Sequence, residues 1–123
     1  MEVYMEINVL ALAYIGDSIY EFYIRNFLIE KKIVKVNELQ KEAIKYVSAK
    51  SQAKFLKEMM ENNMFSEEEL TIIKRARNHK SHASKTTDIL TYKHSTALET
   101  LIGYLYYQGN KSRILEIMQY ITG

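Results

Sequence analysis

The chain of 123 residues contains no cysteine, no proline and no tryptophan, and only four glycines. The lack of cysteine excludes disulfides, thiolate metal sites and thiol nucleophiles. The lack of proline and the scarcity of glycine leave few residues that would interrupt a helix in its interior. No apolar run of about 18 residues and no secretory signal pattern is present, so we expect a cytoplasmic protein that makes no use of a membrane.

Apolar residues recur with helical spacing nearly throughout the chain. A chain of this length with 47% apolar residues can bury one core and is too short for a second full domain. We therefore predict an all-α fold that forms one compact domain over residues 1–123. The first helix should run from about residue 8 to about residue 30. Its predicted buried positions include Leu12, Ile15, Ile19, Phe22 and Phe27.

Polar residues that can cap a helix mark where several helices should begin. Asn37 and Ser48 each precede a long helix-favouring stretch and are predicted to be N-caps. Ser66 and Glu69 match the capping box, in which the serine and glutamate side chains each bond the other residue's backbone amide. The rest of the chain is predicted to form a polar loop over residues 78–92 and helices at about 95–108 and 111–121.

Two apolar helical segments each carry one acid of special interest, Asp17 in ALAYIGDSIYEFYIR and Glu99 in STALETLIGYLY. A carboxylate is costly to bury unless it is paired, hydrogen-bonded or bound to a metal. Each acid also has a nearby glycine, Gly16 or Gly103, which costs about 1 kcal/mol in a helix interior and indicates close approach of a backbone or ligand. Two carboxylates on different helices can hold Mg²⁺, which prefers hard oxygen ligands and keeps several waters. We therefore interpret Asp17 and Glu99 as one metal site.

Each acid also has a simpler interpretation. Thr96 and Glu99 fit the S/T-x-x-E capping box, so Glu99 could serve only to cap the start of its own helix. Asp17 alone could be a solvated residue on a helix surface. Zinc is not indicated by the three histidines, because a closed zinc site needs four ligands that are not visible in this sequence.

A basic segment lies between the two acids. Residues 74–94 hold six lysines and arginines against Asp88 alone, a net charge of +5, which leaves −3 for the remainder because the whole chain carries +2. A local excess of positive charge on a nearly neutral protein favours the docking of a polyanion at one face. Such a stretch is also typical of a solvated helix end and loop.

Two motifs in the expected order carry a family resemblance. YIGDSIYE resembles the signature helix of ribonuclease III domains, and ALETLIGYLYYQG resembles their second acidic motif. Nearly the whole chain resembles the Mini-III family, small bacterial relatives of ribonuclease III that lack a double-stranded-RNA-binding domain. RARNHKS followed by TYKHSTALETLIGYLY is similar to the basic loop and following helix of that family.

The resemblance implies a helical endonuclease that depends on Mg²⁺, with Mn²⁺ as a substitute, and cuts double-stranded RNA as a homodimer. Its products would carry a 5′-phosphate and a 3′-hydroxyl, and its characteristic substrate would be the base-paired stem that flanks large-subunit (23S) ribosomal RNA. Asp17 and Glu99 match the acids of the two motifs, so both are implied to be catalytic and metal-binding. Ala13 and Thr96 stand where many ribonuclease III relatives carry auxiliary acids, which implies a metal shell rich in water.

Two surfaces are predicted to serve this activity. The deep major groove of A-form RNA is closed to side chains, so binding should use phosphates and the 2′-hydroxyls of the minor groove, and arginine suits phosphate well. The predicted RNA-binding residues are Arg75, Arg77, Asn78, Lys80, Lys85 and Lys93. The predicted dimer contact is formed by Ile19, Phe22 and Tyr23.

Two other functions fit parts of the sequence. The first is a non-catalytic double-stranded-RNA-binding or ribosome-assembly module on the same fold, which the absence of acids at Ala13 and Thr96 favours and the presence of Asp17 and Glu99 opposes. The second is a small helical DNA-binding regulator, which the basic segment and the helical content favour. That interpretation leaves both acids unexplained.

Overall fold

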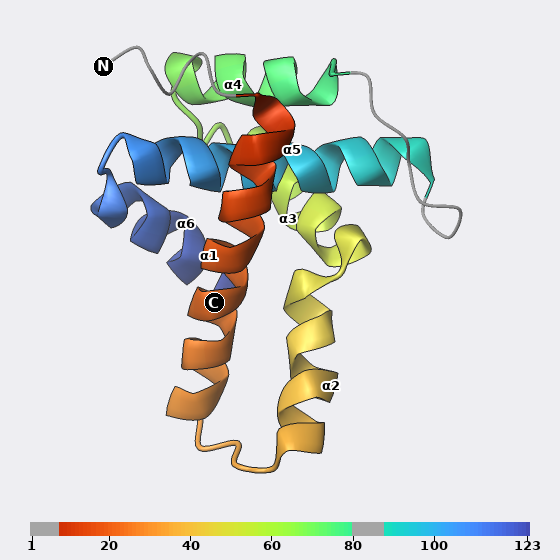
Figure 1. Ribbon diagram of the computed structural model, residues 1–123, viewed down its shortest axis with the longest axis vertical. Helices are drawn as coiled ribbons and strands as arrows, with labels where there is room; N and C mark the ends of the chain where they lie inside the picture. The colour runs from red at the N-terminus through yellow and green to blue at the C-terminus, as the bar shows by residue number, and fades with distance from the viewer. Residues whose placement is uncertain (1–7, 80–87) are drawn as a thin grey trace.

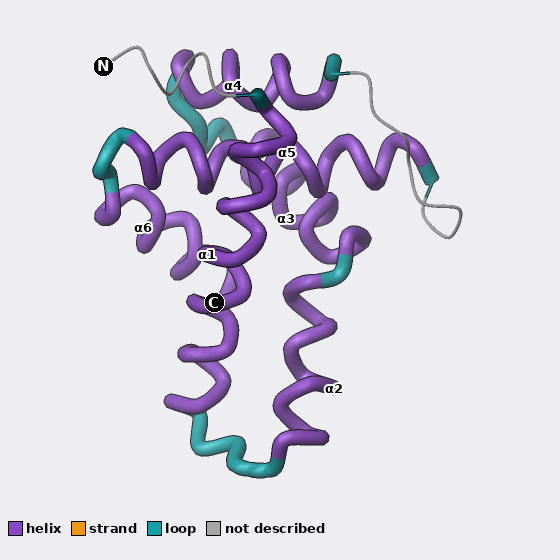
Figure 2. Tube along the Cα trace, viewed as in Figure 1, coloured by secondary structure: helices purple, strands orange, loops and turns teal. Residues whose placement is uncertain are grey.

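The central element is helix α5 (Ile89–Tyr107), most of whose middle residues are buried. The computed structural model describes residues 8–79 and 88–123, and its regular structure there consists of six helices and no strand (Figure 2), which confirms the all-α prediction. The other helices are α1 (Val9–Glu30), α2 (Val36–Val47), α3 (Ala49–Glu61), α4 (Glu67–Arg77) and α6 (Lys111–Thr122). Within these described ranges, no helix combines the length and apolar character that a membrane span requires.

The other helices are arranged around α5. Figure 1 shows α1 running across α5, while α4 lies along one side of α5 and α2 folds back beside the far half of α1. Helix α5 makes extensive contacts with α1, α3 and α4, and smaller ones with α6. A core of large apolar side chains, among them Leu12, Ile24, Leu56 and Leu101, fills the space between these helices.

The crossing of α1 and α5 depends on two glycines. A Cβ atom on Gly16 would lie 1.8 Å from the carbonyl oxygen of Glu99, and one on Gly103 would lie 2.1 Å from the carbonyl oxygen of Leu12. Both distances are far inside van der Waals contact, so only glycine permits this approach. The predicted close approach of another backbone is confirmed. It places Asp17, the residue after Gly16, against the turn of α5 that carries Glu99.

The predicted helix starts were partly right. Ser48 caps α3 by accepting a hydrogen bond from the Ser51 amide, and the Ser66–Glu69 capping box of α4 is present in both directions. Asn37 is not an N-cap, because α2 begins at Val36 and Asn37 lies inside its first turn. The chain leaves α1 through Lys32, whose positive φ of 65° reverses its direction, and it is already helical by Val36.

Helix α5 begins six residues before the predicted start at residue 95, so the long loop was predicted to extend too far. Asp88 is the N-cap, and its carboxylate accepts hydrogen bonds from the Thr91 amide at 2.9 Å and the Thr91 hydroxyl at 2.8 Å. This cap allows the polar turn at the start of α5 to be helical. Residues 89–92 therefore belong to the helix.

The buried face of α1 turns away from Phe22. Leu12 is buried as predicted, whereas Ile15, Ile19 and Phe27 are half-buried and Phe22 is 65% exposed. The buried stripe passes instead through Tyr20, whose hydroxyl donates to the Tyr46 carbonyl at 2.7 Å. Phe22 is two residues further on, about 200° around the helix, and so points away from the core.

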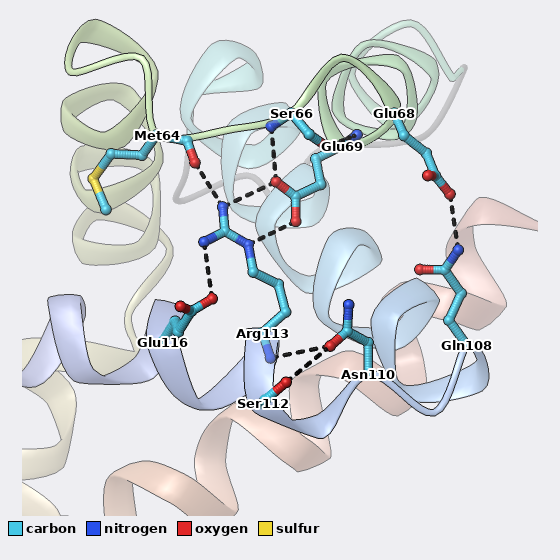
Figure 3. Close-up of polar contacts among 9 residues, drawn as sticks. All are labelled: Met64, Ser66, Glu68, Glu69, Gln108, Asn110, Ser112, Arg113 and Glu116. Atoms are coloured by element: carbon cyan, nitrogen blue, oxygen red, sulfur yellow. Dashed lines mark hydrogen bonds and ion pairs between the residues drawn. The ribbon is translucent and has the colours of Figure 1, made fainter.

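The glutamate of the capping box also holds α6 in place (Figure 3). Glu69 is only 6% exposed and receives hydrogen bonds from Arg113 through Nε at 2.8 Å and Nη2 at 2.9 Å. Its Oε1 also accepts from the Ser66 amide at 2.9 Å, and Arg113 Nη2 donates to the Met64 carbonyl at 2.6 Å. This buried ion pair joins the start of α4 to the start of α6.

Candidate functional site

Asp17 and Glu99 lie together where α1 crosses α5. Asp17 is exposed on α1, while Glu99 is half-buried on α5. The two carboxyl groups are near enough that a hydrogen bond with Asp17 and the negative charge of Asp17 both act on Glu99. The structure thus brings together the two acids that the sequence singled out. One of them faces solvent and the other is held inside the crossing.

The protonation of Glu99 is strongly perturbed. Burial, followed by the hydrogen bond and the charge of Asp17, raises the pKa of Glu99 to about 9. No Lys, Arg or His of the described residues forms a salt bridge with Glu99. Two carboxylates that face each other without a cation cannot both ionise easily. The pair therefore retains a proton at neutral pH unless a positive charge replaces it.

Gln52 is a third member of the site that was not predicted. It lies on α3, is 1% exposed, and its Nε2 donates to Glu99 Oε2 at 3.4 Å. This contact opposes the rise in the pKa of Glu99. The sequence did contain a signal, because Gln52 shares the buried stripe of α3 with Leu56 and Met59 at positions i, i+4 and i+7. A polar residue on an apolar stripe needs a polar partner in the interior.

The capping interpretation of Glu99 is wrong. The N-cap of α5 is Asp88, so Thr96 and Glu99 both lie well inside the helix. Thr96 is 6% exposed, and its carbonyl accepts a hydrogen bond from the Thr100 hydroxyl at 2.8 Å, as expected of an interior helical residue. Glu99 therefore has no helix start to cap.

The site is poor in protein ligands. Ala13 and Thr96, where the family resemblance implied that auxiliary acids are lacking, are both buried and supply no carboxylate. Glu21, one turn beyond Asp17, is ion-paired with Arg25 at 3.1 Å, although its charge contributes to the raised pKa of Glu99. In residues 8–79 and 88–123, no group of three or more acidic or histidine side chains could hold a metal. The donor set is two carboxylates and one amide.

Four of the predicted RNA-binding residues belong to the described part of the chain, and they lie near one end of the molecule. Arg75 and Arg77 are in the last turn of α4, Asn78 is its C-cap, and Lys93 is in the second turn of α5. Figure 1 shows the end of α4 and the start of α5 on the same side of the molecule. Lys80 and Lys85 lie outside the described residues. The role of this group stays a prediction.

The chain is similar to known proteins along nearly its whole length. The family described as "Ribonuclease III domain" matches residues 10–110. A Mini-ribonuclease 3 of Enterococcus faecalis is 44% identical over 121 residues, which cover 98% of this chain and 92% of that protein. The Mini-ribonuclease 3 of Brevibacillus brevis is 50% identical over 113 residues, which cover 91% and 83% of the two chains. The crystal structure of a Fusobacterium nucleatum protein is 30% identical and superimposes with a TM-score of 0.86 over 94% of this chain and 93% of that one.

Proposed function

Since the chain belongs to the ribonuclease III domain family and, within it, to the Mini-ribonuclease 3 proteins, we propose that Asp17 and Glu99 are the catalytic residues of its endoribonuclease site. Proteins of the ribonuclease III family are metal-dependent and act on double-stranded RNA, and this chain is an endoribonuclease of that kind. One observation carries the assignment to residues. Two carboxylates from helices far apart in the chain meet at one point, and no cation of the described residues neutralises them.

The metal is proposed to be Mg²⁺, for which Mn²⁺ can substitute. The residues fit such an ion, because two hard carboxylate oxygens meet with no salt-bridged cation among the described residues, and burial together with Asp17 raises the pKa of Glu99. Asp17 and Glu99 would hold it and leave most of its coordination positions to water and to the RNA. When bound, the ion supplies positive charge that stabilises the developing charge of the phosphodiester and lowers the pKa of a water molecule.

The protein's own residues position this chemistry. Asp17 is exposed and therefore accessible to a bound RNA strand, whereas Glu99 is half-buried and held by Gln52. The close approach at Gly16 and Gly103 fixes the backbones on which the two acids stand. Arg75, Arg77, Asn78 and Lys93, together with Lys80 and Lys85, would bind phosphates and minor-groove hydroxyls of the duplex.

Cleavage of a long duplex RNA with and without Mg²⁺ tests the proposal. Glu99→Gln and Asp17→Asn keep the side-chain shapes and remove the charges, so each should lower the cleavage rate by roughly 10³-fold while RNA binding measured without metal persists. If the native chain binds duplex RNA and never cuts it in Mg²⁺ or Mn²⁺, the ribosome-assembly alternative replaces this proposal. A chain that bound duplex DNA as tightly as RNA would instead favour the regulator alternative.

A homodimer would place two such sites against opposite strands and convert two single-strand cuts into one double-strand cut. The proposed contact is the apolar patch around Ile19, Phe22 and Tyr23, which lines a hollow of about 350 Å³ together with Tyr106 and Ile114. Phe22 is 65% exposed and Tyr106 is 44% exposed, and exposed apolar side chains gathered at one hollow are typical of an interface. Phe22→Ser should shift the chain toward monomer in sedimentation, and an unchanged molecular mass would contradict this contact.

The natural substrate is proposed to be the base-paired stem flanking large-subunit ribosomal RNA, cut in the cytoplasm to leave 5′-phosphate ends. The support is membership of the Mini-ribonuclease 3 proteins. Mapping of the ends produced from such a precursor by the native chain tests it. Cleavage of generic duplexes with no cut in the stem would contradict this substrate and leave the enzyme class intact.

A further inference from the structure

A row of lysines lies on α3, outside the basic segment that the sequence emphasised. Lys50, Lys54 and Lys57 are exposed and follow one another at spacings of four and three residues. Residues at these spacings share one face of a helix. The three lysines line a hollow of about 340 Å³ whose opposite wall is the start of α5, through Leu90, Thr91 and His94. We call this hollow the α3–α5 groove.

The lysines of this groove are available for a ligand. Within the described part of the chain, none of the three forms a salt bridge, although Glu58 and Glu61 line the same groove toward the end of α3. By contrast, Lys45 on α2 forms a salt bridge with Glu42 at 3.0 Å. The opposite wall adds no charge of its own through Leu90 or Thr91. The ammonium groups therefore face a groove whose best match is an anion.

The groove adjoins the carboxylate site along two helices. On α3, Gln52 lies between Lys50 and Lys54 in the chain and contacts Glu99 from the buried side of the helix, while the lysines occupy its exposed side. On α5, His94 of the groove precedes Glu99 by five residues, a rise of about 7.5 Å along the helix axis. A polyanion with one phosphate at the carboxylate pair can thus place a phosphate further along its backbone in the groove.

We propose that the α3–α5 groove binds the phosphate backbone of duplex RNA a few nucleotides from the cleaved bond. The inference rests on the proposed function for the identity of the anion. It adds a second basic contact surface, on α3, to the one predicted for residues 74–94. Ammonium groups bind phosphate as point charges with little sequence preference, so the contact contributes affinity and register and does not read the sequence.

The test measures binding of a fluorescent RNA duplex of about 20 base pairs, without divalent metal, over a range of salt concentrations. The groove variant is Lys50→Gln/Lys54→Gln/Lys57→Gln. The matched control is Lys32→Gln/Lys35→Gln/Lys41→Gln, which removes three exposed lysines from the far turn after α1 and from α2. The groove variant should bind about tenfold more weakly or worse, and the slope of log K against log salt should fall by about 2 to 3. The control should change affinity by less than about twofold.

Two readouts separate this inference from the assignment of the catalytic acids. Both triple variants should unfold at nearly the native temperature, since all six lysines are exposed, and in cleavage assays the groove variant should raise KM while kcat at saturating RNA stays unchanged. Equal losses of RNA affinity in the two variants, or an unchanged salt slope in the groove variant, would overturn the proposal that the groove binds RNA. Loss of binding in the groove variant of a chain that never cuts RNA would uphold the groove and overturn the proposed function.

Discussion

Glu69 and Glu99 are both withdrawn from solvent, and their surroundings are opposite. Glu69 faces Arg113, which donates to both carboxylate oxygens at 2.8 and 2.9 Å. Glu99 faces a second acid, Asp17, and among the described residues its one neutral side-chain donor is Gln52, at 3.4 Å. The negative charge of Glu69 is compensated within the chain. That of Glu99 needs a proton or a cation from outside.

This difference separates a structural acid from a functional one. A buried ion pair with satisfied hydrogen bonds fixes how two helices meet, and nothing further has to bind. A buried carboxylate beside another carboxylate disfavours the folded state when both are ionised, and that cost is recovered when a cation arrives. Each acid can therefore be tested by a change that affects its partner.

Removal of the cation beside Glu69 should have the largest effect on stability. Arg113→Ala leaves a 6% exposed carboxylate without its partner and frees the Met64 carbonyl, so the free energy of unfolding should fall by about 3 to 5 kcal/mol in urea titrations. Arg25→Ala removes an exposed pair, with Glu21, and should cost less than about 1 kcal/mol. Similar losses in the two variants would show that the Glu69–Arg113 pair is no more important than a surface pair.

Separation of the two helices at the functional site should have the next largest effect. Gly16→Ala puts a Cβ atom 1.8 Å from the Glu99 carbonyl oxygen, so the backbones must move apart at a cost of about 3 kcal/mol. Gly109→Ala is the matched control, because its φ of 73° is strained for alanine while nothing lies within 4 Å, and it should cost about 1 kcal/mol. The folded Gly16→Ala protein should also bind Mn²⁺ more weakly in titration calorimetry. An unchanged affinity would show that the close approach of α1 and α5 is not needed for metal binding.

The pH dependence of stability should reveal the uncompensated acid. The pKa of Glu99 is raised from 4.5 in the unfolded chain to about 9, so between these values the folded state holds a proton that the unfolded state has lost. Stability without metal should therefore fall as pH rises from 5 toward 9. Glu99→Gln removes this contribution. Between pH 5 and pH 8, the free energy of unfolding of the native chain should therefore fall by on the order of 2 kcal/mol more than that of the variant. Parallel curves for the two proteins would contradict the raised pKa.

Local sequence signals predicted some features of the Glu69 and Glu99 sites and missed others. The Ser66–Glu69 capping box and the glycines beside Asp17 and Glu99 act over one helical turn or one crossing, so they could be recognised in the sequence itself. The partner of Glu69 could not, because Arg113 lies 44 residues further along the chain and resembles any other arginine in a first helical turn. Long-range partners depend on how helices pack, which spacing alone does not determine.

The same limit explains the errors around α5 and the omission of Gln52. The Asp88 cap lies in a threonine-rich stretch that favours loop as much as helix, and the exposure of Phe22 depends on which face of α1 meets α5. Gln52 belongs to the site because α3 packs on α5 opposite Glu99. Its position on a buried stripe indicated that it had a polar partner, and only the fold identifies which one.

The smallest expected effect comes from Gln52, the neutral donor to Glu99 on α3. Gln52→Leu removes the 3.4 Å contact, which should cost about 1 kcal/mol of stability, and it removes the group that lowers the pKa of Glu99. Cleavage measured against pH should therefore reach half its maximum at a higher pH than in the native chain, so that the deficit relative to the native chain narrows as the pH rises. Gln119→Leu, at an exposed position of α6, is the control and should leave the profile unchanged. A Gln52→Leu enzyme slowed equally at every pH would mean that Gln52 only fills space, because a packing defect does not depend on the protonation of its neighbour.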